Sequence, residues 1–168
     1  MKSHGTGLPP WKFARKGDGV VFETSVLIFH PENLYIGDNV YIGHQSILKG
    51  YYKNTFKIGD GTWIGQQCFL HSGGGIEIGE NVGVGPGVKI LTSQHQLDDP
   101  VMPIMHQKIL FSSVKIGKGS DIGSNATILP GITLGEFCQV GAGAVVTKSF
   151  PGRSIIAGVP ANLLRVFE

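Results

Sequence analysis

The chain of 168 residues has two cysteines, no long apolar run and almost no helical periodicity. Cys68 and Cys138 show neither metal-ligand spacing nor a disulfide framework, so we expect a reduced intracellular chain in which both are packing residues. No apolar run approaches the ~20 residues of a membrane-spanning helix, and the first residues lack the apolar core of a secretory signal. The sequence therefore predicts a cytoplasmic protein without membrane insertion.

Charge of one sign is also lacking, because 14 Lys and Arg face 12 Asp and Glu, for a net charge of +2. Proteins that bind nucleic acid usually gather Lys and Arg on one face, and the densest basic run here, Lys12 to Lys16, is short. We therefore expect no nucleic-acid partner. The length fits a single domain over residues 1–168.

Glycine is abundant, with 26 residues, and it accompanies a six-residue repeat. Counting by six, every position is Ile, Leu or Val through residues 36–48, 58–70, 78–90 and 116–146. The glycine that usually follows is missing at every third step, so the true unit is three hexads, or 18 residues. Such a unit predicts an all-β solenoid of coils, each made of three short strands with one aliphatic column per face.

The breaks in the repeat all follow the third step of a coil. Extra residues enter after Ile28, Leu48, Leu70 and Ile90, which places every inserted loop along one edge. The longest insertion contains His95, and insertions on one face of a solenoid often mark the binding face. A second series, four residues after each aliphatic, is small or β-branched and includes both cysteines, as a stacked interior requires.

We divide the single domain into five segments. These are an N-terminal segment with a degraded first coil that contains Phe22 and Ile28 (1–33), coils (34–90), a long protruding loop (91–115), coils (116–150) and a C-terminal cap (151–168). In the cap, Pro160 favours the start of a short helix with Leu163, Leu164 and Phe167 on one side. Such a helix would cover the open last coil.

Two strings resemble a known family, namely IGENVGVGPGVKILTSQHQ at 78–96 and LPGITLGEFCQVGAGAVVTKSFPGRSIIAGVPANLLR at 129–165. They are similar to the hexapeptide-repeat acyltransferases, in the sugar O- and N-acetyltransferase branch that includes maltose and galactoside acetyltransferases. The resemblance covers about residues 34–166. It implies a left-handed parallel β-helix, a homotrimer with active sites between subunits, acetyl-CoA as donor and a role in carbohydrate or surface-polysaccharide biosynthesis.

The resemblance also implies site residues. It makes His95, in the loop, the general base, and it gives acetyl-CoA five contacts in the C-terminal part: Ser124, Ala142, Thr147, Lys148 and Arg165. The chain departs from the branch twice, with Asp121 where Trp is frequent and Asn162 where Arg is frequent.

The chemistry fits a histidine, because a sugar hydroxyl is a poor nucleophile until a base such as neutral imidazole takes its proton. His71 occupies the corner directly below Leu91, so it lies on the same edge as His95 and either binds the acceptor or is a surface residue. Asp98 either contacts an acceptor hydroxyl or keeps a loop solvated. His95 itself has the alternative of an ordinary loop histidine, and the roles of His44 and His106 stay open.

The acceptor is not fixed by the sequence. Tyr51, Tyr52 and Phe56 form an inserted corner on the edge of His95 and either stack on a sugar or a base or pack against a neighbouring subunit. A free sugar, a nucleotide-linked sugar and a growing glycan remain alternatives, as do O- and N-transfer.

Two other functions stay open. One is a zinc enzyme resembling the γ-class carbonic anhydrases, for which histidines are available but no pair has the close spacing of that family, so we expect no metal. The other is a non-catalytic scaffold or binding subunit.

Overall fold

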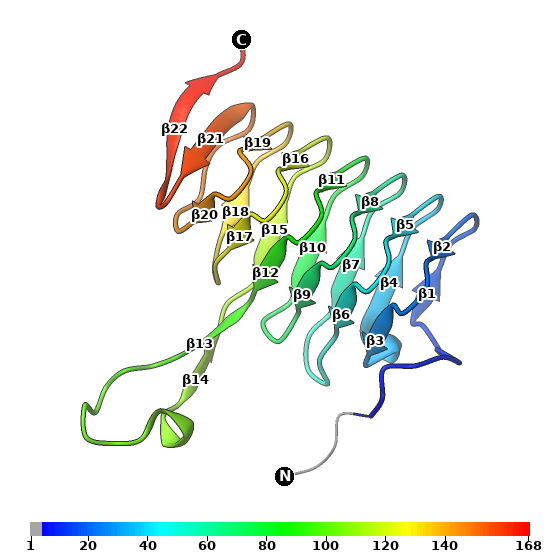
Figure 1. Ribbon diagram of the computed structural model, residues 1–168, viewed down its shortest axis with the longest axis horizontal. Helices are drawn as coiled ribbons and strands as arrows, with labels where there is room; N and C mark the ends of the chain where they lie inside the picture. Colours follow the sequence, from blue (N-terminus) through cyan, green and yellow to red (C-terminus); the bar gives the residue numbers. More distant parts are fainter. Residues whose placement is uncertain (1–4) are drawn as a thin grey trace.

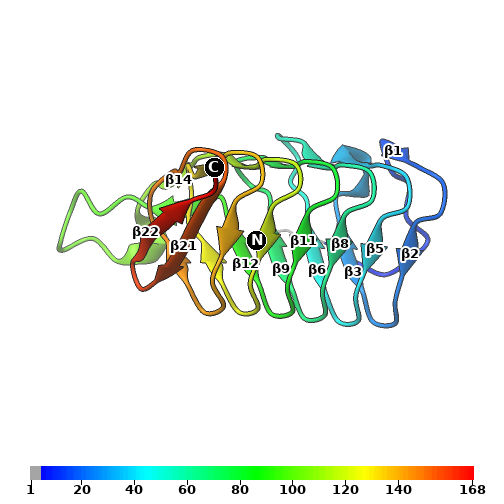
Figure 2. The ribbon, with the colours of Figure 1, turned by 90° about the horizontal axis from the view of Figure 1, so that it is seen from above.

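The repeat folds as predicted into an all-β, left-handed parallel β-solenoid of about seven turns, and the computed structural model describes residues 5–168 of it (Figure 1). Each full coil gives one strand to each of three parallel sheets, named A, B and C in the order in which a coil visits them. The corners between them are named A/B, B/C and C/A. Seen from above, the coils stack in one row, and one hairpin extends beyond them (Figure 2).

The strands are short. Sheet A consists of β1 (Arg15–Lys16), β4 (Leu34–Ile36), β7 (Phe56–Ile58), β10 (Ile76–Ile78), β15 (Val114–Ile116) and β18 (Thr133–Leu134). Sheet B consists of β2 (Val21–Phe22), β5 (Tyr41–Ile42), β8 (Trp63–Ile64), β11 (Gly83–Val84), β16 (Asp121–Ile122), β19 (Gln139–Val140), β21 (Ser154–Gly158) and β22 (Ala161–Val166). Sheet C consists of β3 (Leu27–Phe29), β6 (Ile47–Lys49), β9 (Phe69–His71), β12 (Lys89–Leu91), β17 (Thr127–Ile128) and β20 (Val145–Val146).

Three further elements stand outside these sheets. A two-stranded antiparallel sheet pairs β13 (Ser93–His95) with β14 (Ile109–Phe111). The other two are the 3-10 helices η1 (Pro31–Asn33) and η2 (Ile104–His106). No helix within residues 5–168 has the length and the apolar character needed to cross a membrane.

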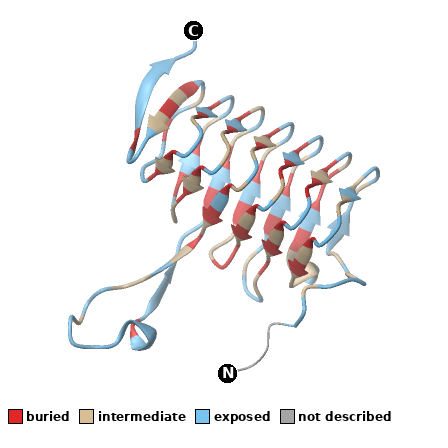
Figure 3. Ribbon diagram, in the orientation of Figure 1, coloured by how far each residue is buried: buried red, intermediate tan, exposed pale blue. Residues whose placement is uncertain are grey.

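The register confirms the aliphatic columns. Ile36 pairs with Ile58 in sheet A, Ile42 with Ile64 in sheet B and Leu48 with Leu70 in sheet C, and all are buried. The degraded first coil is real, since Phe22 pairs with Ile42 and Ile28 with Leu48. The buried positions alternate with exposed ones along the strands, so the interior is a continuous apolar column (Figure 3).

The small residues of the second series fill the corners of the interior. The buried Ser46 hydroxyl donates to the Gly65 carbonyl at 2.8 Å and accepts from the Cys68 backbone N–H at 3.1 Å. Cys68 and Cys138 are buried and unpaired, and burial raises the pKa of both thiols. Both cysteines are therefore packing residues, as predicted, and their burial favours the protonated thiol over the thiolate.

Where a glycine follows the aliphatic residue, contact with the next coil requires it. A Cβ on Gly43 would lie 2.7 Å from the backbone nitrogen of Gln66, closer than real Cβ contacts. Positive φ falls two residues later instead, as at Gln45, where φ is 60°. The hexad glycine is thus a device for close stacking of coils.

The cap at the C-terminal end is a β-hairpin, so the predicted helix is wrong. Strand β22 pairs antiparallel with β21, which itself pairs parallel with β19 of the last coil. The open edge of sheet B supplies backbone partners that a helix would leave unused. Pro160 lies in the turn between the two strands, and the expected apolar face does not form because Leu163, Leu164 and Phe167 are exposed.

Candidate active site

The loop that carries His95 is a hairpin formed by residues 93–111, which we call the arm. It leaves the solenoid at the C/A corner after β12 (Figure 1). Thr92 fixes the point of departure, because its buried hydroxyl donates to the His71 carbonyl at 2.6 Å and accepts from the Gly74 N–H at 2.8 Å. Beyond it, Ser93 pairs with Phe111 and His95 with Ile109. The histidine therefore stands on a regular strand, four residues after β12 ends at Leu91.

One ring nitrogen of His95 is buried and has no hydrogen-bond partner within residues 5–168, namely Nδ1. A buried polar atom left unsatisfied costs on the order of 1–3 kcal/mol. The chain itself covers this nitrogen, so contact with an outside group would require the side chains around it to move. The side chain as a whole is half-buried.

His71 lies beside the root of the arm, as its predicted position below Leu91 requires. Its Nδ1 is 3.5 Å from the hydroxyl of Ser93. Burial, and after it the charge of Lys49, lowers the pKa of His71, so the imidazole is neutral at neutral pH. Because alternate residues of a strand share a face, Ser93 and His95 lie on one side of β13, which is the side that meets His71 at its root.

An aromatic cluster surrounds His71. The ring of Tyr51 lies 6.0 Å from that of His71 in an edge-on arrangement and 5.7 Å from that of Phe111, and Tyr52 follows at 4.9 Å from Tyr51. Phe56, grouped with the tyrosines in the sequence, is instead fully buried in β7. Two aromatic residues of the inserted corner are thus near the arm, and the third belongs to the core.

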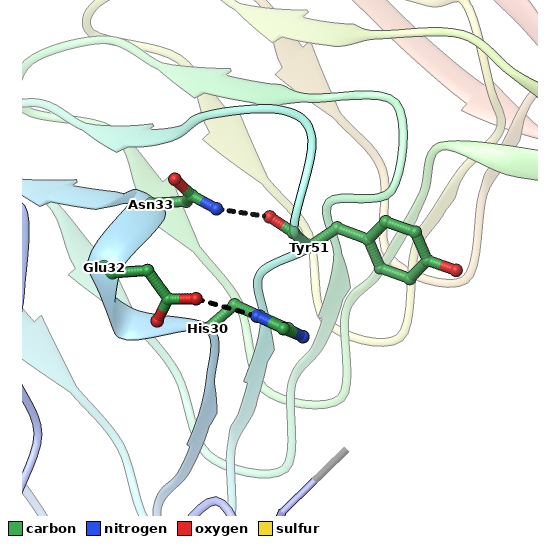
Figure 4. A network of polar contacts seen from close by, with 4 residues as sticks. All are labelled: His30, Glu32, Asn33 and Tyr51. Atoms are coloured by element: carbon green, nitrogen blue, oxygen red, sulfur yellow. Dashed lines mark hydrogen bonds and ion pairs between the residues drawn. The ribbon is translucent and has the colours of Figure 1, made fainter. Parts of the chain in front are cut away.

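Residues of the preceding coil make polar contacts near the inserted corner that carries Tyr51 (Figure 4). Asn33 Nδ2 donates to the Tyr51 carbonyl at 2.7 Å. His30 Nδ1 lies 2.8 Å from Glu32 Oε1. Burial acts to raise the pKa of Glu32, but the hydrogen bond with His30 contributes to a net lowering, so this carboxylate stays ionised.

Asp98 lies near the tip of the arm and is exposed. Its carboxylate accepts a hydrogen bond from the side chain of Gln96. The neighbouring Asp99 organises the tip, since its carboxylate accepts from the Val101 N–H at 2.9 Å and its carbonyl from Gln107 Nε2 at 2.5 Å. The arm also exposes a series of apolar side chains: Leu97, Val101, Met102, Ile104, Met105, Ile109, Leu110 and Phe111.

Of the five expected cofactor residues, Ser124 and Ala142 are brought together. They follow β16 and β19 at the B/C corner of successive coils, where the Gly143 N–H donates to the Ser124 carbonyl at 2.8 Å. A Cβ on Gly143 would meet nothing within 4 Å, so the backbone of this corner is open to a ligand.

The other three lie elsewhere on the C-terminal coils. Thr147 and Lys148 follow β20 at the C/A corner, and Lys148 Nζ lies 5.6 Å from the Phe150 ring centre. Arg165 is exposed on β22, with its guanidinium 5.3 Å from the Phe167 ring centre. Within one chain, the five expected cofactor residues therefore lie at two different corners and on the terminal hairpin. The small exposed corner and the two exposed cations still fit the chemistry of a thioester with several phosphates.

His44 and His106 do not join His95. His44 is exposed at the B/C corner, 2.7 Å from Thr24 Oγ1 and 3.4 Å from Glu23. His106 is exposed in η2. Across residues 5–168, no three His, Cys, Asp or Glu side chains are grouped so as to hold a metal ion.

Comparison with known sequences gives a family match over two segments. A profile of the family described as "Hexapeptide repeat of succinyl-transferase" matches residues 56–91 and 113–148. A probable acetyltransferase of Mycobacterium tuberculosis is 32% identical over 151 residues, which is 88% of this chain and 50% of that protein. The galactoside O-acetyltransferase of Escherichia coli is 27% identical over 158 residues, 91% of this chain and 64% of that enzyme. The chain thus spans half the length of the first relative and under two thirds of the second.

A solved structure extends the similarity to three dimensions. A mutant of AntD, an N-acyltransferase from Bacillus cereus, superposes with a TM-score of 0.83 at 25% identity, covering 93% of this chain and 85% of that one. That protein was crystallised in complex with dTDP and coenzyme A.

Proposed function

Because this chain belongs to the hexapeptide-repeat acyltransferase family, we propose that it moves an acetyl group from acetyl-CoA to a hydroxyl or amine of a sugar or nucleotide-linked sugar. The observation that carries the proposal is the placement of His95 on a strand of the arm, with a buried ring nitrogen lacking a partner within residues 5–168. Because the chain itself covers Nδ1, the other ring nitrogen, Nε2, is the one that can face a ligand.

His95 acts as the general base in this proposal. It accepts the proton of the acceptor hydroxyl or amine while the oxygen or nitrogen attacks the thioester carbonyl carbon. The C–S bond then breaks, and the proton held by His95 passes to the departing thiolate, which leaves as coenzyme A. No covalent enzyme intermediate is required, which agrees with the two buried, protonated cysteines.

A homotrimer completes the site in this proposal. In one chain, His95 is at the C/A corner and the Ser124–Ala142 corner is at B/C, so sheet C separates them. The arm also exposes large apolar residues, among them Val101 at 89% and Leu97 at 79%. Exposed apolar area of this kind is typical of a protein–protein contact. An arm that reaches over a neighbouring chain would cover it and bring His95 to that chain's cofactor corner.

The cofactor residues then have distinct roles. The open backbone at Ser124 and Ala142 lies along the pantetheine arm, and Thr147 and Lys148 lie toward its phosphate end. Arg165 pairs with a phosphate, for which a guanidinium is well suited. His71 and Asp98 contact the acceptor, His71 as a neutral donor or acceptor of a hydrogen bond beside the Tyr51 ring. AntD, which binds dTDP, supports a nucleotide-linked acceptor. A cytoplasmic location and a role in polysaccharide synthesis stay predictions.

The test is a thermal-shift titration of chelator-treated protein with acetyl-CoA, followed by release of free thiol in the presence of candidate sugars. A ligand that binds the folded state alone stabilises it by about 2.7 kcal/mol at a hundredfold excess over Kd, so a clear rise of the midpoint is expected. No rise with acetyl-CoA, and recovery with zinc, would support the metal-enzyme alternative instead. If neither acetyl-CoA nor zinc shifts the midpoint, the result would support the non-catalytic scaffold or binding subunit.

A further inference from the structure

The outer face of sheet B carries a row of side chains that the proposed reaction has not used. In successive coils the outward positions are Tyr41 on β5, Trp63 on β8, Gly83 on β11 and Asp121 on β16. Strand pairing places each directly over the one before it. The row therefore runs from two aromatic rings, across a glycine, to a carboxylate.

The two rings are stacked on each other. Those of Tyr41 and Trp63 lie 5.6 Å apart between centres with an interplanar angle of only 3°, and Trp63 remains 39% exposed. Since the rings stack along the direction in which coils follow one another, the second face of the indole is turned toward the coil of Gly83. That face has no side chain from Gly83 to cover it.

Gly83 is not required by the backbone. It lies in a strand, its φ is not positive, and its N–H donates to the Ser120 carbonyl at 2.9 Å. A Cβ placed there would meet one atom within 4 Å, Asp121 Oδ1 at 3.3 Å, whereas a Cβ on the corner glycine Gly85 would lie 2.7 Å from the backbone nitrogen of Ser124. The effect of glycine at position 83 is therefore to leave a slot between the indole and the carboxylate.

The slot has room for one ring. Neighbouring strands lie about 4.8 Å apart, so the backbones of Trp63 and Asp121, two coils apart, are separated by roughly 10 Å. The Asp121 carboxylate leans into this space, because its Oδ1 lies 3.3 Å from the Cβ position of Gly83. A ring in contact on both sides needs about 3.5–4.0 Å to each neighbour, or roughly 7–8 Å in all. The space beside the indole therefore admits at most one flat ring, with the Asp121 carboxylate at its far side.

We propose that Trp63, Gly83 and Asp121 form a subsite for one pyranose ring of a carbohydrate acceptor. The apolar C–H face of the sugar packs on the indole, and the Asp121 carboxylate accepts hydrogen bonds from ring hydroxyls. A nucleobase would also stack, but the carboxylate can only accept hydrogen bonds, and the several hydroxyls of a pyranose ring supply them. Asp121 therefore favours the sugar part of an acceptor.

This subsite rests on the proposed acetyl transfer for its role, and it faces away from His95 of the same chain. In a three-sided coil, the C/A corner that bears the arm is opposite sheet B. The subsite of one chain therefore serves His95 of another copy. A hollow of about 530 Å³ adjoins it, bordered by Asp121, Gln139, Phe137 and Phe167, so an acceptor larger than one ring has space to continue.

A binding test uses the fluorescence of Trp63. The chain has two tryptophans, and Trp11→Phe leaves Trp63 as the one reporter. We expect a saturable change with at least one of maltose, methyl β-galactoside and dTDP-glucose, a weaker affinity by tenfold or more in Asp121→Asn, and none in Gly83→Val. Valine suits the strand at position 83 and fills the slot, so this variant keeps the fold. Thr133→Val, exposed on sheet A, is the matched control and should bind as the parent does.

The kinetic test separates this inference from the proposed function. With the best acceptor, Gly83→Val should raise the acceptor KM at least tenfold and leave the KM of acetyl-CoA unchanged. Saturable sugar binding without any acetyl transfer would remove the proposed function and keep the subsite. Acetyl transfer with an unchanged acceptor KM in Gly83→Val would overturn the subsite alone. Dissociation of the oligomer by Trp63→Ala, seen in sedimentation, would also overturn it, because the face would then be a subunit contact.

Discussion

Ser93 Oγ lies 3.5 Å from Nδ1 of His71, although 22 residues separate them in the chain. The contact joins the root of the arm to the last residue of a strand in sheet C. Because Ser93 and His95 share a face of β13, the position of the candidate base depends on what holds this root. His71, Thr92 and Phe111 are therefore expected to affect the reaction through the placement of His95.

Replacing His95 with alanine tests its role most directly. If it takes the acceptor proton in the transition state, kcat should fall by about 10²–10⁴, with little change in the KM of acetyl-CoA. Steady-state release of free thiol, with both substrates varied, gives the two constants. His44→Ala, at an exposed histidine on the B/C corner, is the control and should retain activity. An equal loss of cofactor affinity in His95→Ala would make it a contact residue instead.

Adding one methyl group at Gly73 should disturb the arm. Its Cβ would lie 2.7 Å from Cε1 of Phe111 and 3.0 Å from Cε1 of His71. The Phe111 ring is exposed and can turn away, so Gly73→Ala should cost less than the ~1–3 kcal/mol of an overpacked core, while the displaced ring should reduce kcat. Urea denaturation and the thiol assay check both.

The matched control for Gly73→Ala is the double variant with Phe111→Ala, in which the ring that clashes is absent. The two changes should then combine to less than the sum of their separate costs. Strict additivity would show that the ring of Phe111 does not oppose the added methyl group.

Much of the fold follows from the sequence because each coil repeats the same physical requirement. Ile36, Ile58 and Ile78 fill equivalent inward positions, and the period of six exposes that directly. A further series, which starts the four central strands of sheet A, was missed: Leu34, Phe56, Ile76 and Val114. Phe56 therefore looked like part of an exposed aromatic corner although it belongs to this buried series.

What the sequence did not predict depends on contacts between distant segments. The spacing of Leu163 and Leu164 suits a helix, but the segment forms a strand because it pairs with the free edge of sheet B at β21. Phe111 lies in the long insertion, which has no period, so its contact with Tyr51 had no signal. Thr92 stood within the string that marked His95, but its role as the anchor of the arm depends on His71 one coil below.

Acidification should destabilise the fold through His71. Burial, and then the charge of Lys49, lowers its pKa below the ordinary value of 6.5. As pH falls below about 6.5, the unfolded chain therefore takes up a proton before the folded chain does, and the free energy of unfolding decreases. His71→Gln should remove the contribution of His71 to this decrease in the free energy of unfolding. The thermal midpoint of the variant should therefore fall less than that of the parent between about pH 7 and 5. His106→Gln, on the exposed part of the arm, should keep the slope of the parent; an unchanged slope in His71→Gln would contradict the argument.

Arg165 tests whether the terminal hairpin takes part in cofactor binding. The residue is exposed on β22, with its guanidinium over the ring of Phe167, and this placement holds the charge at the edge of sheet B. A charge-assisted bond to a phosphate is worth about 1.5–3 kcal/mol, so Arg165→Ala should raise the KM of acetyl-CoA by roughly ten- to a hundredfold and leave kcat nearly unchanged. Lysine at this position should restore part of the affinity, since it keeps the charge but not the bidentate geometry. Arg15→Ala, on β1 at the other end of the solenoid, controls for loss of a positive charge. If Arg165→Ala binds acetyl-CoA as tightly as Arg15→Ala does, the guanidinium serves the hairpin and not the cofactor.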